Sequence, residues 1–429
     1  MHVMEKLRGF RDIYPEEAEP RKRIFKVAED ISERFGFSKV EFPSLELLEL
    51  YKIKSGDELV NQIFSFTDRG NRSVALIPEA TPSLVRMISS RKDLRMPAKW
   101  YSFQRFWRYE EPQAGRQREF YQFNADIFGV DSYQADAEIV GLAASILDDL
   151  GLRGKYIIYL NSREFMESFL SSYGISDPER AYLSIDRMKK KGEDATVDEL
   201  TELGLNGNAA ESLVDSIGTA YSPDDFPVSN YSIDSGGRRS LDRLLKTARL
   251  IRGYTDSDIR IDLSIVRGLS YYTGIVFEAF YKFSEFRSIL GGGRYDSLSQ
   301  LISGTNIPSV GFGMGDVVLE AVLKNEGIFD RDLKGPDVFV CYSSAEIFEY
   351  ALKVANRLRK GGLKVSVSLS VRSISSQLKA ASKGNYRYAA IIGERELNSQ
   401  EVSFKELSSG TQKAIPFERI DNFQKFFDQ

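Results

Sequence analysis

Histidine and cysteine are almost absent from this sequence of 429 residues: each occurs once, as His2 and Cys341. A lone cysteine excludes an internal disulfide and a thiolate zinc cluster, and its apolar surroundings (DVFVCY) are typical of a buried strand. A lone histidine near the chain terminus excludes a Ser–His–Asp triad, a histidine-ligated metal and an imidazole general base. Any catalysis must therefore use carboxylates, arginines, tyrosines and backbone groups, which suits reactions whose substrate supplies its own nucleophile.

Long hydrophobic runs are also missing. No stretch approaches the ~18 consecutive apolar residues of a membrane span, and the opening MHVMEKLRGFRD contains no apolar signal-peptide core. We therefore expect a cytoplasmic protein that does not interact with membranes. Hydrophobic residues make up 42% and charged residues 28% of the chain, a globular balance. The length predicts about three domains.

The formal net charge of −4 is unevenly distributed. Residues 335–429 carry a net charge of +4 and the remainder −8. Between Lys353 and Gly393 there are nine basic residues and no acidic one. A basic module attached to an acidic body is typical of a nucleic-acid contact. The alternative is a solvated surface whose charge has no binding role.

The first 160 residues show helix and strand patterns in alternation. Apolar residues recur at helical spacing over 16–35, and a second helix is predicted over 134–150. Two aromatic-rich runs with strand alternation, 99–110 and 119–129, predict an antiparallel pair of strands.

Three further segments complete the chain. Between about 161 and 252 short helical stretches with polar connections predict a helical insertion. Strand patterns return over 259–282, and the run Gly291–Gly293 is predicted as a turn. Beyond a linker near Asp330–Pro336, three strand patterns alternate with helices, which predicts an α/β module.

The predicted antiparallel pair carries the first candidate site. Strand alternation places Arg108 and Glu110 on one face of their strand. On the partner strand it places four residues on one face: Phe120, Gln122, Asn124 and Asp126. An arginine, two carboxylates and a flat ring on one sheet face suit a purine nucleotide and a small zwitterion. The alternative is the solvent-facing side of an amphipathic sheet.

Two glycine-containing segments are further candidates. Arg267 ends a strand pattern and precedes the Tyr271-Tyr272 pair, which places one cation and two hydroxyls near a pocket, although tyrosine pairs also occur as core fillers. No G-x-x-x-x-G-K-S/T sequence occurs, which excludes a P-loop. The run Gly311–Gly315 lacks the third glycine of a dinucleotide fingerprint, because Asp316 occupies that position. It fits close packing under a flat ring equally well.

Taken in chain order, these segments resemble the class II aminoacyl-tRNA synthetases, and among them the histidyl-tRNA synthetase family. The family's opening is similar to RGFRDIYPEEAEPR, its amino-acid-recognition segment to LIPEATPSLVR, and its motif 2 to FWRYEEPQAGRQREFYQFNADIFG. Its two histidine-specific signatures are similar to VRGLSYYTGIVFE and LGGGRYDSL, and the start of motif 3 to PSVGFGMG. Its anticodon-binding domain is similar to SSQLKAASKGNYRYAAIIGERELNSQEVSFKELSSG. The resemblance covers nearly the whole chain.

This resemblance implies an α+β catalytic domain, residues 1–160 and 253–328, in which helices flank an antiparallel sheet. It also implies a helical insertion domain (161–252) and a C-terminal α/β anticodon-binding domain (335–429). The implied activity is ATP-dependent activation of L-histidine to histidyl-adenylate and transfer to the 3′ end of tRNA(His). ATP is then a substrate accompanied by Mg²⁺, no metal site of the protein's own is expected, and the chain is expected to form a homodimer.

Matched position by position, the resemblance implies a histidine pocket. Glu79 and Thr81 would hold the α-amino group, Gln122 would orient the carboxylate, and Asp126 and Tyr272 would read the imidazole. The positions matched to this pocket are Glu79, Ala80, Thr81, Arg108, Gln122, Asp126, Arg267, Tyr271, Tyr272 and Tyr295.

The resemblance also implies an ATP site. Arg108 would pair with the α-phosphate and the substrate carboxylate, and Arg267 would lie opposite it across the reacting phosphate. Glu110 would contact the adenine amine, and Phe120 would stack on the ring. The ATP-binding positions are Arg108, Glu110, Arg116, Phe120, Gly311 and Gly313, and the catalytic ones are Arg108, Arg267 and Gln122. Because the substrate carboxylate is already anionic, its attack on the α-phosphorus needs no protein base.

Two positions depart from the family pattern. Ser270 stands where the family often has aspartate, and Val318 stands where motif 3 usually carries an arginine that stacks under adenine. In the basic C-terminal module, Arg372, Lys379 and Lys383 are expected to bind tRNA.

Two other functions are compatible with parts of this pattern. One is a non-catalytic paralogue, similar to the regulatory subunit of histidine biosynthesis that resembles this catalytic domain. The other is a tRNA-binding module without catalysis, suggested by Val318 and the basic C-terminal segment. The presence of Arg108, Glu110 and Arg267 favours the enzyme.

Overall fold

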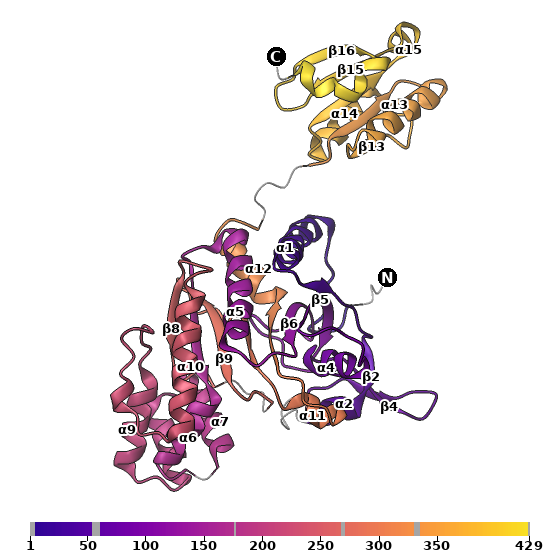
Figure 1. Ribbon diagram of the computed structural model, residues 1–429. Helices are drawn as coiled ribbons and strands as arrows, with labels where there is room; N and C mark the ends of the chain where they lie inside the picture. Colours follow the sequence, from indigo (N-terminus) through magenta and orange to yellow (C-terminus); the bar gives the residue numbers. More distant parts are fainter. Residues whose placement is uncertain (1–4, 54–60, 176, 267–270, 330–334, 428–429) are drawn as a thin grey trace. The chain divides into compact units, whose positions relative to one another are not determined.

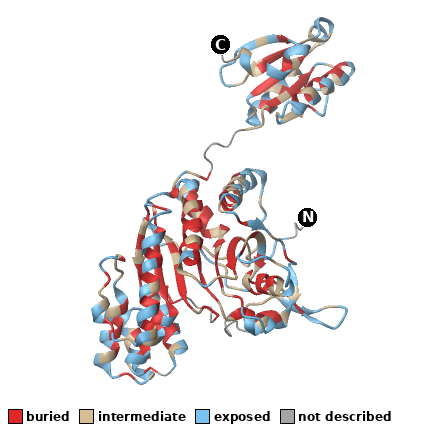
Figure 2. Ribbon diagram, in the orientation of Figure 1, coloured by how far each residue is buried: buried red, intermediate tan, exposed pale blue. Residues whose placement is uncertain are grey.

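The computed structural model describes residues 5–53, 61–175, 177–266, 271–329 and 335–427. The chain forms two compact units, Met1–Arg331 (the N-terminal unit) and Asp332–Gln429 (the C-terminal unit) (Figure 1). The boundary falls in the linker predicted from the sequence. Buried side chains line the interior of each unit, and the C-terminal unit has a hydrophobic core of its own (Figure 2).

An eight-stranded sheet organises the N-terminal unit. Its strands are β1 (Ser38–Lys39), β5 (Ala98–Trp107), β6 (Glu119–Phe128), β7 (Tyr156–Ser162), β8 (Asp258–Ile261), β9 (Ile275–Tyr281), β10 (Leu290–Arg294) and β11 (Ser309–Gly315). They are ordered β1-β5-β6-β11-β10-β9-β7-β8. The six central strands pair antiparallel, as predicted, whereas the edge strands β1 and β8 pair parallel with their neighbours.

Side chains along β6 alternate between the two faces of this sheet. Phe123, Ala125 and Ile127 join a hydrophobic core shared with the helices α1 (Pro15–Arg34) and α5 (Tyr133–Leu147), which confirms both predicted helices (Figure 1). The even-numbered residues from 120 to 126 project from the opposite face. We call that side of the sheet the site face.

A second hydrophobic core lies on the site face. It brings together aromatic side chains of the large sheet, such as Phe106 and Phe128, with Leu84 and Val85 of α4 (Thr81–Ser90). A small sheet in the order β2-β4-β3 and the short helix α2 adjoin it; their bounds are Leu45–Leu47 (β2), Ser65–Thr67 (β3), Ser73–Leu76 (β4) and Leu48–Lys52 (α2). The connection from β4 to α4 thereby carries residues 79–81 to the site face.

The run Gly291–Gly293 is part of the central strand β10, so the predicted turn is wrong. A Cβ on Gly292 would lie 2.1 Å from the carbonyl oxygen of Gly311, and one on Gly293 would lie 2.6 Å from that of Ile275. Gly292 and Gly293 are therefore required for close packing inside the sheet rather than for a change of chain direction.

The segment between β7 and β8 is helical, as predicted. It contains α6 (Arg163–Ser172), α7 (Pro178–Lys191), α8 (Glu193–Glu202), α9 (Gly207–Gly218) and α10 (Ser235–Ile251). Phe165, Ile185 and Leu213 from these helices belong to the same hydrophobic core as the large sheet. The assignment of 161–252 to a separate domain stays a prediction. Two more helices, α11 (Leu298–Ser303) and α12 (Asp316–Asn325), flank β11.

The C-terminal unit contains the predicted α/β alternation and a hairpin that was not predicted. Its sheet, ordered β13-β12-β14-β15-β16, comprises β12 (Val338–Tyr342), β13 (Val365–Val367), β14 (Tyr388–Ile392), β15 (Glu401–Glu406) and β16 (Gln412–Pro416). The first three strands are parallel, and β15 and β16 extend the sheet antiparallel. The helices are α13 (Phe348–Lys360), α14 (Ile374–Lys383) and α15 (Glu394–Ser399). Cys341 is fully buried in β12, which confirms its place in the core.

In the described part of the chain, no helix has the length and apolar character needed to cross a membrane.

Candidate active site

A cavity of about 440 Å³ opens on the site face. Its wall is built from β6, the loop that follows β5, the β9–β10 connection and the start of α12. Six residues predicted from the sequence line it: Arg108, Glu110, Arg116, Phe120, Gln122 and Gly313. We call it the nucleotide cavity.

Arg108 and Glu110 lie beyond the end of β5 at Trp107, so strand alternation is not what places them. The Nε of Arg108 donates to the carbonyl of Pro78 at 2.9 Å, and its guanidinium lies 5.5 Å from the centre of the Phe120 ring. The Glu110 carboxylate is 2.7 Å from the guanidinium of Arg116 and 4.0 Å from that of Arg108. Two cations therefore bracket one carboxylate beside an aromatic ring.

Gln122 lies at the inner end of the nucleotide cavity. Its Nε2 donates to Oδ1 of Asn124 at 2.5 Å, which holds the side chain along the strand. The neighbouring strand β11 makes room for it, since a Cβ on Gly313 would lie 2.1 Å from Gln122 Nε2. The glycine predicted to lie under a flat ring therefore serves the packing of a site residue.

Four residues farther along β6, Asp126 is buried among tyrosines, with an exposed fraction of 3%. The hydroxyl of Tyr295 donates to its Oδ1 at 2.5 Å. Burial raises the pKa of Asp126 to about 7, although the Tyr295 hydrogen bond acts in the opposite direction. Gly311 adjoins this carboxylate rather than the nucleotide cavity: its Cβ would lie 1.8 Å from Asp126 Oδ1.

Glu79 is the second buried carboxylate of this region. The hydroxyl of Tyr271 donates to its Oε2 at 2.6 Å. The Tyr271 ring lies 5.0 Å from that of Tyr272 and 6.1 Å from that of Tyr295, so one tyrosine cluster joins Glu79 to Asp126. Burial raises the pKa of Tyr271 and Tyr295 well above the ordinary value, which keeps both hydroxyls as hydrogen-bond donors. We call this cluster the tyrosine pocket, a name that refers to the packed side chains and not to a measured cavity.

The structure thus brings most predicted site residues to one face of β6. Gln122 and Asp126 lie four positions apart, roughly 13 Å along the strand. Gln122 lines the nucleotide cavity, and Asp126 belongs to the tyrosine pocket. Ala80 and Thr81 stand at the start of α4, directly after Glu79. Arg267 and Ser270 lie outside the described residues.

Three charged residues that the sequence did not single out also line the nucleotide cavity. They are Asp186 of α7, Glu278 of β9 and Arg287 of the β9–β10 connection. Glu278 accepts a hydrogen bond from the Ser288 hydroxyl at 3.2 Å. Glu278 ends the segment VRGLSYYTGIVFE, whereas Asp186 and Arg287 belong to no motif, so only the tertiary arrangement could identify those two.

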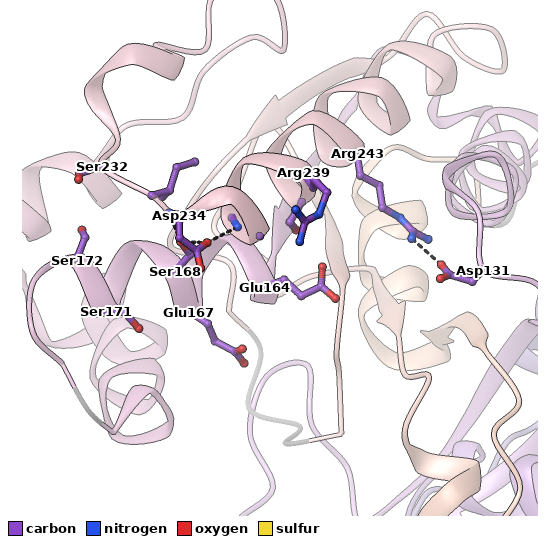
Figure 3. Close-up of a pocket in the computed structure, with 14 residues that line it drawn as sticks. Asp131, Glu164, Glu167, Ser168, Ser171, Ser172, Ser232, Asp234, Arg239 and Arg243 are labelled. Carbon is purple, nitrogen blue, oxygen red and sulfur yellow. Dashed lines mark hydrogen bonds and ion pairs between the residues drawn. The ribbon is translucent and has the colours of Figure 1, made fainter.

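A larger cavity, of about 830 Å³, lies between α6 and the first half of α10 (Figure 3). Four carboxylates and two arginines line it, and no predicted site residue does so. Arg243 is paired with Asp131 at 2.6 Å, and Asp234 caps α10 by accepting from the backbone N–H of Gly237 at 2.7 Å. This excess of carboxylates does not suit a triphosphate.

The residues predicted to bind tRNA lie in the C-terminal unit. Arg372, Lys379 and Lys383 are exposed, and the two lysines lie one helical turn apart on α14. The window that contains no acidic residue in sequence does meet acids in space: Lys353 pairs with Glu349 at 2.8 Å, and Arg357 with Asp421 at 2.6 Å.

An antiparallel sheet with a cavity on one face, in a chain that also contains a second α/β unit, is the architecture expected of a class II aminoacyl-tRNA synthetase. Comparison with known proteins supports this class and narrows it. The histidyl-tRNA synthetase family model matches residues 9–316, and an anticodon binding domain model matches residues 337–425. The chain belongs to the histidyl-tRNA synthetase family.

Individual relatives agree with this assignment. The chain is 47% identical to the histidine–tRNA ligase of Thermoplasma volcanium over 412 residues, 96% of each chain. It is 44% identical to that of Picrophilus torridus over 428 residues, 98% of each. The crystal structure of histidyl-tRNA synthetase from Nostoc sp. PCC 7120 is similar with a TM-score of 0.83 and 26% identity, covering 99% of this chain and 100% of that one. Nothing in these comparisons favours the non-catalytic paralogue.

Proposed function

We propose that this enzyme activates L-histidine with ATP and transfers it to the 3′ end of tRNA(His). The observation that carries the proposal is the site face of β6, where Gln122 borders a nucleotide-sized cavity and Asp126 a buried tyrosine pocket. Family membership and the length of chain shared with histidine–tRNA ligases support the same reaction.

Histidine binds in the tyrosine pocket. Asp126 and Tyr272 read the imidazole, and Glu79 with Thr81 holds the α-amino group. A buried carboxylate is a strong acceptor for either cationic or N–H groups of the ligand, because water does not compete with them there. Gln122 orients the histidine carboxylate toward the nucleotide cavity.

Two tyrosines act by positioning these carboxylates. Tyr271 holds Glu79, and Tyr295 holds Asp126, each through one hydrogen bond. Their rings also make the wall of the pocket apolar enough to keep both carboxylates out of water.

In the activation step, a histidine carboxylate oxygen forms a bond to the α-phosphorus of ATP while the bond to the β-phosphate oxygen breaks. Pyrophosphate leaves and histidyl-adenylate remains. Arg108 stabilises the charge on the α-phosphate, and we assign Arg267 to its opposite side. Glu110 accepts from the adenine amine, and Phe120 stacks on the ring. The 3′ hydroxyl of tRNA then attacks the carbonyl and releases AMP.

Magnesium is expected to enter with ATP. Mg²⁺ is usually bound through one or two carboxylates together with substrate phosphates, and Glu278 and Asp186 supply carboxylates at the nucleotide cavity. In the described ranges no group of three or more His, Cys, Asp and Glu side chains is arranged as a metal site. The ion, when bound, neutralises charge on the departing pyrophosphate.

The remaining assignments concern partners and location. We assign tRNA binding to Arg372, Lys379 and Lys383, and we infer a cytoplasmic homodimer on the basis of the family relationship. Light scattering tests the dimer: it is expected to give twice the chain mass of 48.6 kDa. A mass equal to one chain would refute it.

Pyrophosphate exchange is the decisive experiment for the reaction. Labelled pyrophosphate should enter ATP when histidine is added and not when any other amino acid is added. Charging should then require tRNA(His). A non-catalytic paralogue would give no exchange, and a tRNA-binding module would bind the RNA without exchange, so either result would overturn the proposal.

A further inference from the structure

Arg287 projects into the nucleotide cavity from a part of the chain that no motif marks. It lies in the connection between β9 and β10, three residues before Leu290, and lines the same cavity as Arg108, Arg116 and Phe120. Any role of Arg287 in catalysis rests on the proposed function, because that function makes ATP the occupant of this cavity.

Arg287 and Val318 converge on one point of the motif 2 loop. An ideal Cβ on Gly115 would lie 3.4 Å from Cδ of Arg287 and 3.3 Å from Cγ2 of Val318. Val318 stands at the position where motif 3 of the family usually carries an arginine. Because the two side chains meet at Gly115, an arginine introduced at position 318 would start beside Arg287.

The charges around Arg287 indicate an anionic ligand. The nearest carboxylate in the loop, Glu110, is already paired with Arg116. Among the described residues no carboxylate lies within 4.0 Å of Arg287, and its hydrogen-bond partner is the neutral Gln113 at 3.4 Å. Burial and the neighbouring Arg116 cation lower the pKa of Arg287, and the Glu110 carboxylate offsets this only in part. Two guanidiniums that repel each other in a cavity are both stabilised by one anion bound between them.

We infer that Arg287 and Arg116 together bind the β- and γ-phosphates of ATP. The polyphosphate would lie between the two guanidiniums, which would also hold pyrophosphate as it leaves. This is a binding role for the nucleotide and not for histidine, whose pocket lies at the other end of the β6 site face.

The inference is tested with Arg287→Ala in the pyrophosphate-exchange assay. The KM values for ATP and for pyrophosphate should rise roughly 10- to 100-fold, the loss typical of one charge-assisted contact. The KM for histidine should stay within about twofold. Inhibition by AMP, which lacks the β- and γ-phosphates, should be unchanged. Lys282→Ala is the matched control, because Lys282 is a basic residue of the same connection that does not line the cavity.

A second variant tests whether a cation beside Gly115 is sufficient for this role. Arg287→Ala combined with Val318→Arg should recover most of the lost affinity for ATP, since the new guanidinium starts beside the same glycine. An unchanged KM for ATP in Arg287→Ala, an equal loss of AMP binding, or a double variant as defective as the single one would overturn the inference. Absence of histidine-dependent exchange in the unaltered enzyme would instead refute the proposed function.

Discussion

At the scale of single residues, the proposed histidine site depends on carboxylates held out of water. Asp126 and Glu79 each have an exposed fraction of 3%, and each accepts a hydrogen bond from a buried tyrosine. Burial disfavours the charged form of a carboxyl group, and a single hydroxyl only partly offsets this cost. Asp126 is therefore tuned to titrate near neutral pH, where the imidazole of histidine also titrates.

Replacing Asp126 with Asn should remove a pH dependence of stability. The folded pKa of Asp126, about 7, lies above the value near 3.9 of an unfolded aspartate. Between these values the folded state keeps a proton that the unfolded state has released, so the free energy of unfolding falls as the pH rises. Relative to Asp126→Asn, the unaltered enzyme should lose about 3 kcal/mol between pH 5 and pH 8. Urea unfolding of both proteins measures this difference.

Asp68 offers a control of opposite sign. A backbone hydrogen bond from Arg72 lowers the pKa of this exposed carboxyl, so its stabilising contribution is lost as the pH falls. Asp68→Asn should therefore be less stable than the unaltered enzyme at neutral pH and approach its stability as the pH falls. Parallel stability curves for Asp126→Asn and the unaltered enzyme would show that Asp126 titrates normally.

At the scale of elements, the pairing of β6 with β11 decides how the site is packed. Gly311 and Gly313 lie opposite Asp126 and Asn124 in this pair. Their missing side chains leave the space that Asp126 and Gln122 occupy. The glycines of β11 therefore leave room for the polar side chains of β6, and this fit cannot be predicted from the sequence of either strand alone.

Replacing Gly311 with Ala should impair histidine binding specifically. The new Cβ would lie 1.8 Å from Asp126 Oδ1 and must displace that carboxylate. We expect the KM for histidine in pyrophosphate exchange to rise roughly 10- to 100-fold, with little change in the KM for ATP. Gly207→Ala is the control, because no atom lies within 4 Å of a Cβ at that position in α9. Equal losses for both substrates would indicate general disruption of the sheet.

At the scale of the whole molecule, the sites that we propose for activation and for RNA recognition lie in separate compact units. The nucleotide cavity and the tyrosine pocket are built within Met1–Arg331, and the basic residues of α14 belong to Asp332–Gln429. Each unit buries its own hydrophobic core. Removing one unit should therefore leave the chemistry of the other intact.

Deleting residues 335–429 should leave histidine-dependent pyrophosphate exchange within about threefold of the full chain while greatly reducing charging of tRNA(His). Phosphate contacts supply most of the affinity for RNA, and unpaired loop bases carry the sequence information. Steady-state exchange and charging rates for both proteins give the comparison. Equal charging by the truncated enzyme would show that the basic segment is only a solvated surface.

Point substitutions locate the RNA contact within the C-terminal unit. Lys379→Gln with Lys383→Gln should reduce the salt dependence of tRNA binding, by roughly 0.7 in log–log slope for each phosphate of single-stranded RNA that the variant no longer neutralises. Lys353→Gln is the matched control, because its ammonium group is already paired with Glu349. The same slope for both variants would contradict the assignment to α14.

Local patterns in the sequence were sufficient to predict many of the helices and strands and the class of chemistry. Helical periodicity and strand alternation depend on residues close in the chain, so α1, α5 and the β5–β6 pair were predicted correctly. The near absence of histidine and cysteine excluded whole mechanisms without reference to the fold. The family motifs are contiguous segments, which is why Asp126, Gln122 and Glu79 could be assigned before their positions in space were known.

Contacts between distant segments were decided only by the tertiary structure. Gly291–Gly293 has the composition of a turn, yet it pairs with β9 and β11 as a strand, and backbone atoms of these neighbours exclude a side chain at Gly292 and Gly293. Arg287 reaches the nucleotide cavity from a connection with no motif of its own. The window without acidic residues meets Asp421 across the C-terminal unit. In each case the deciding partner lies far along the chain, and steric exclusion and charge pairing act through space rather than along the sequence.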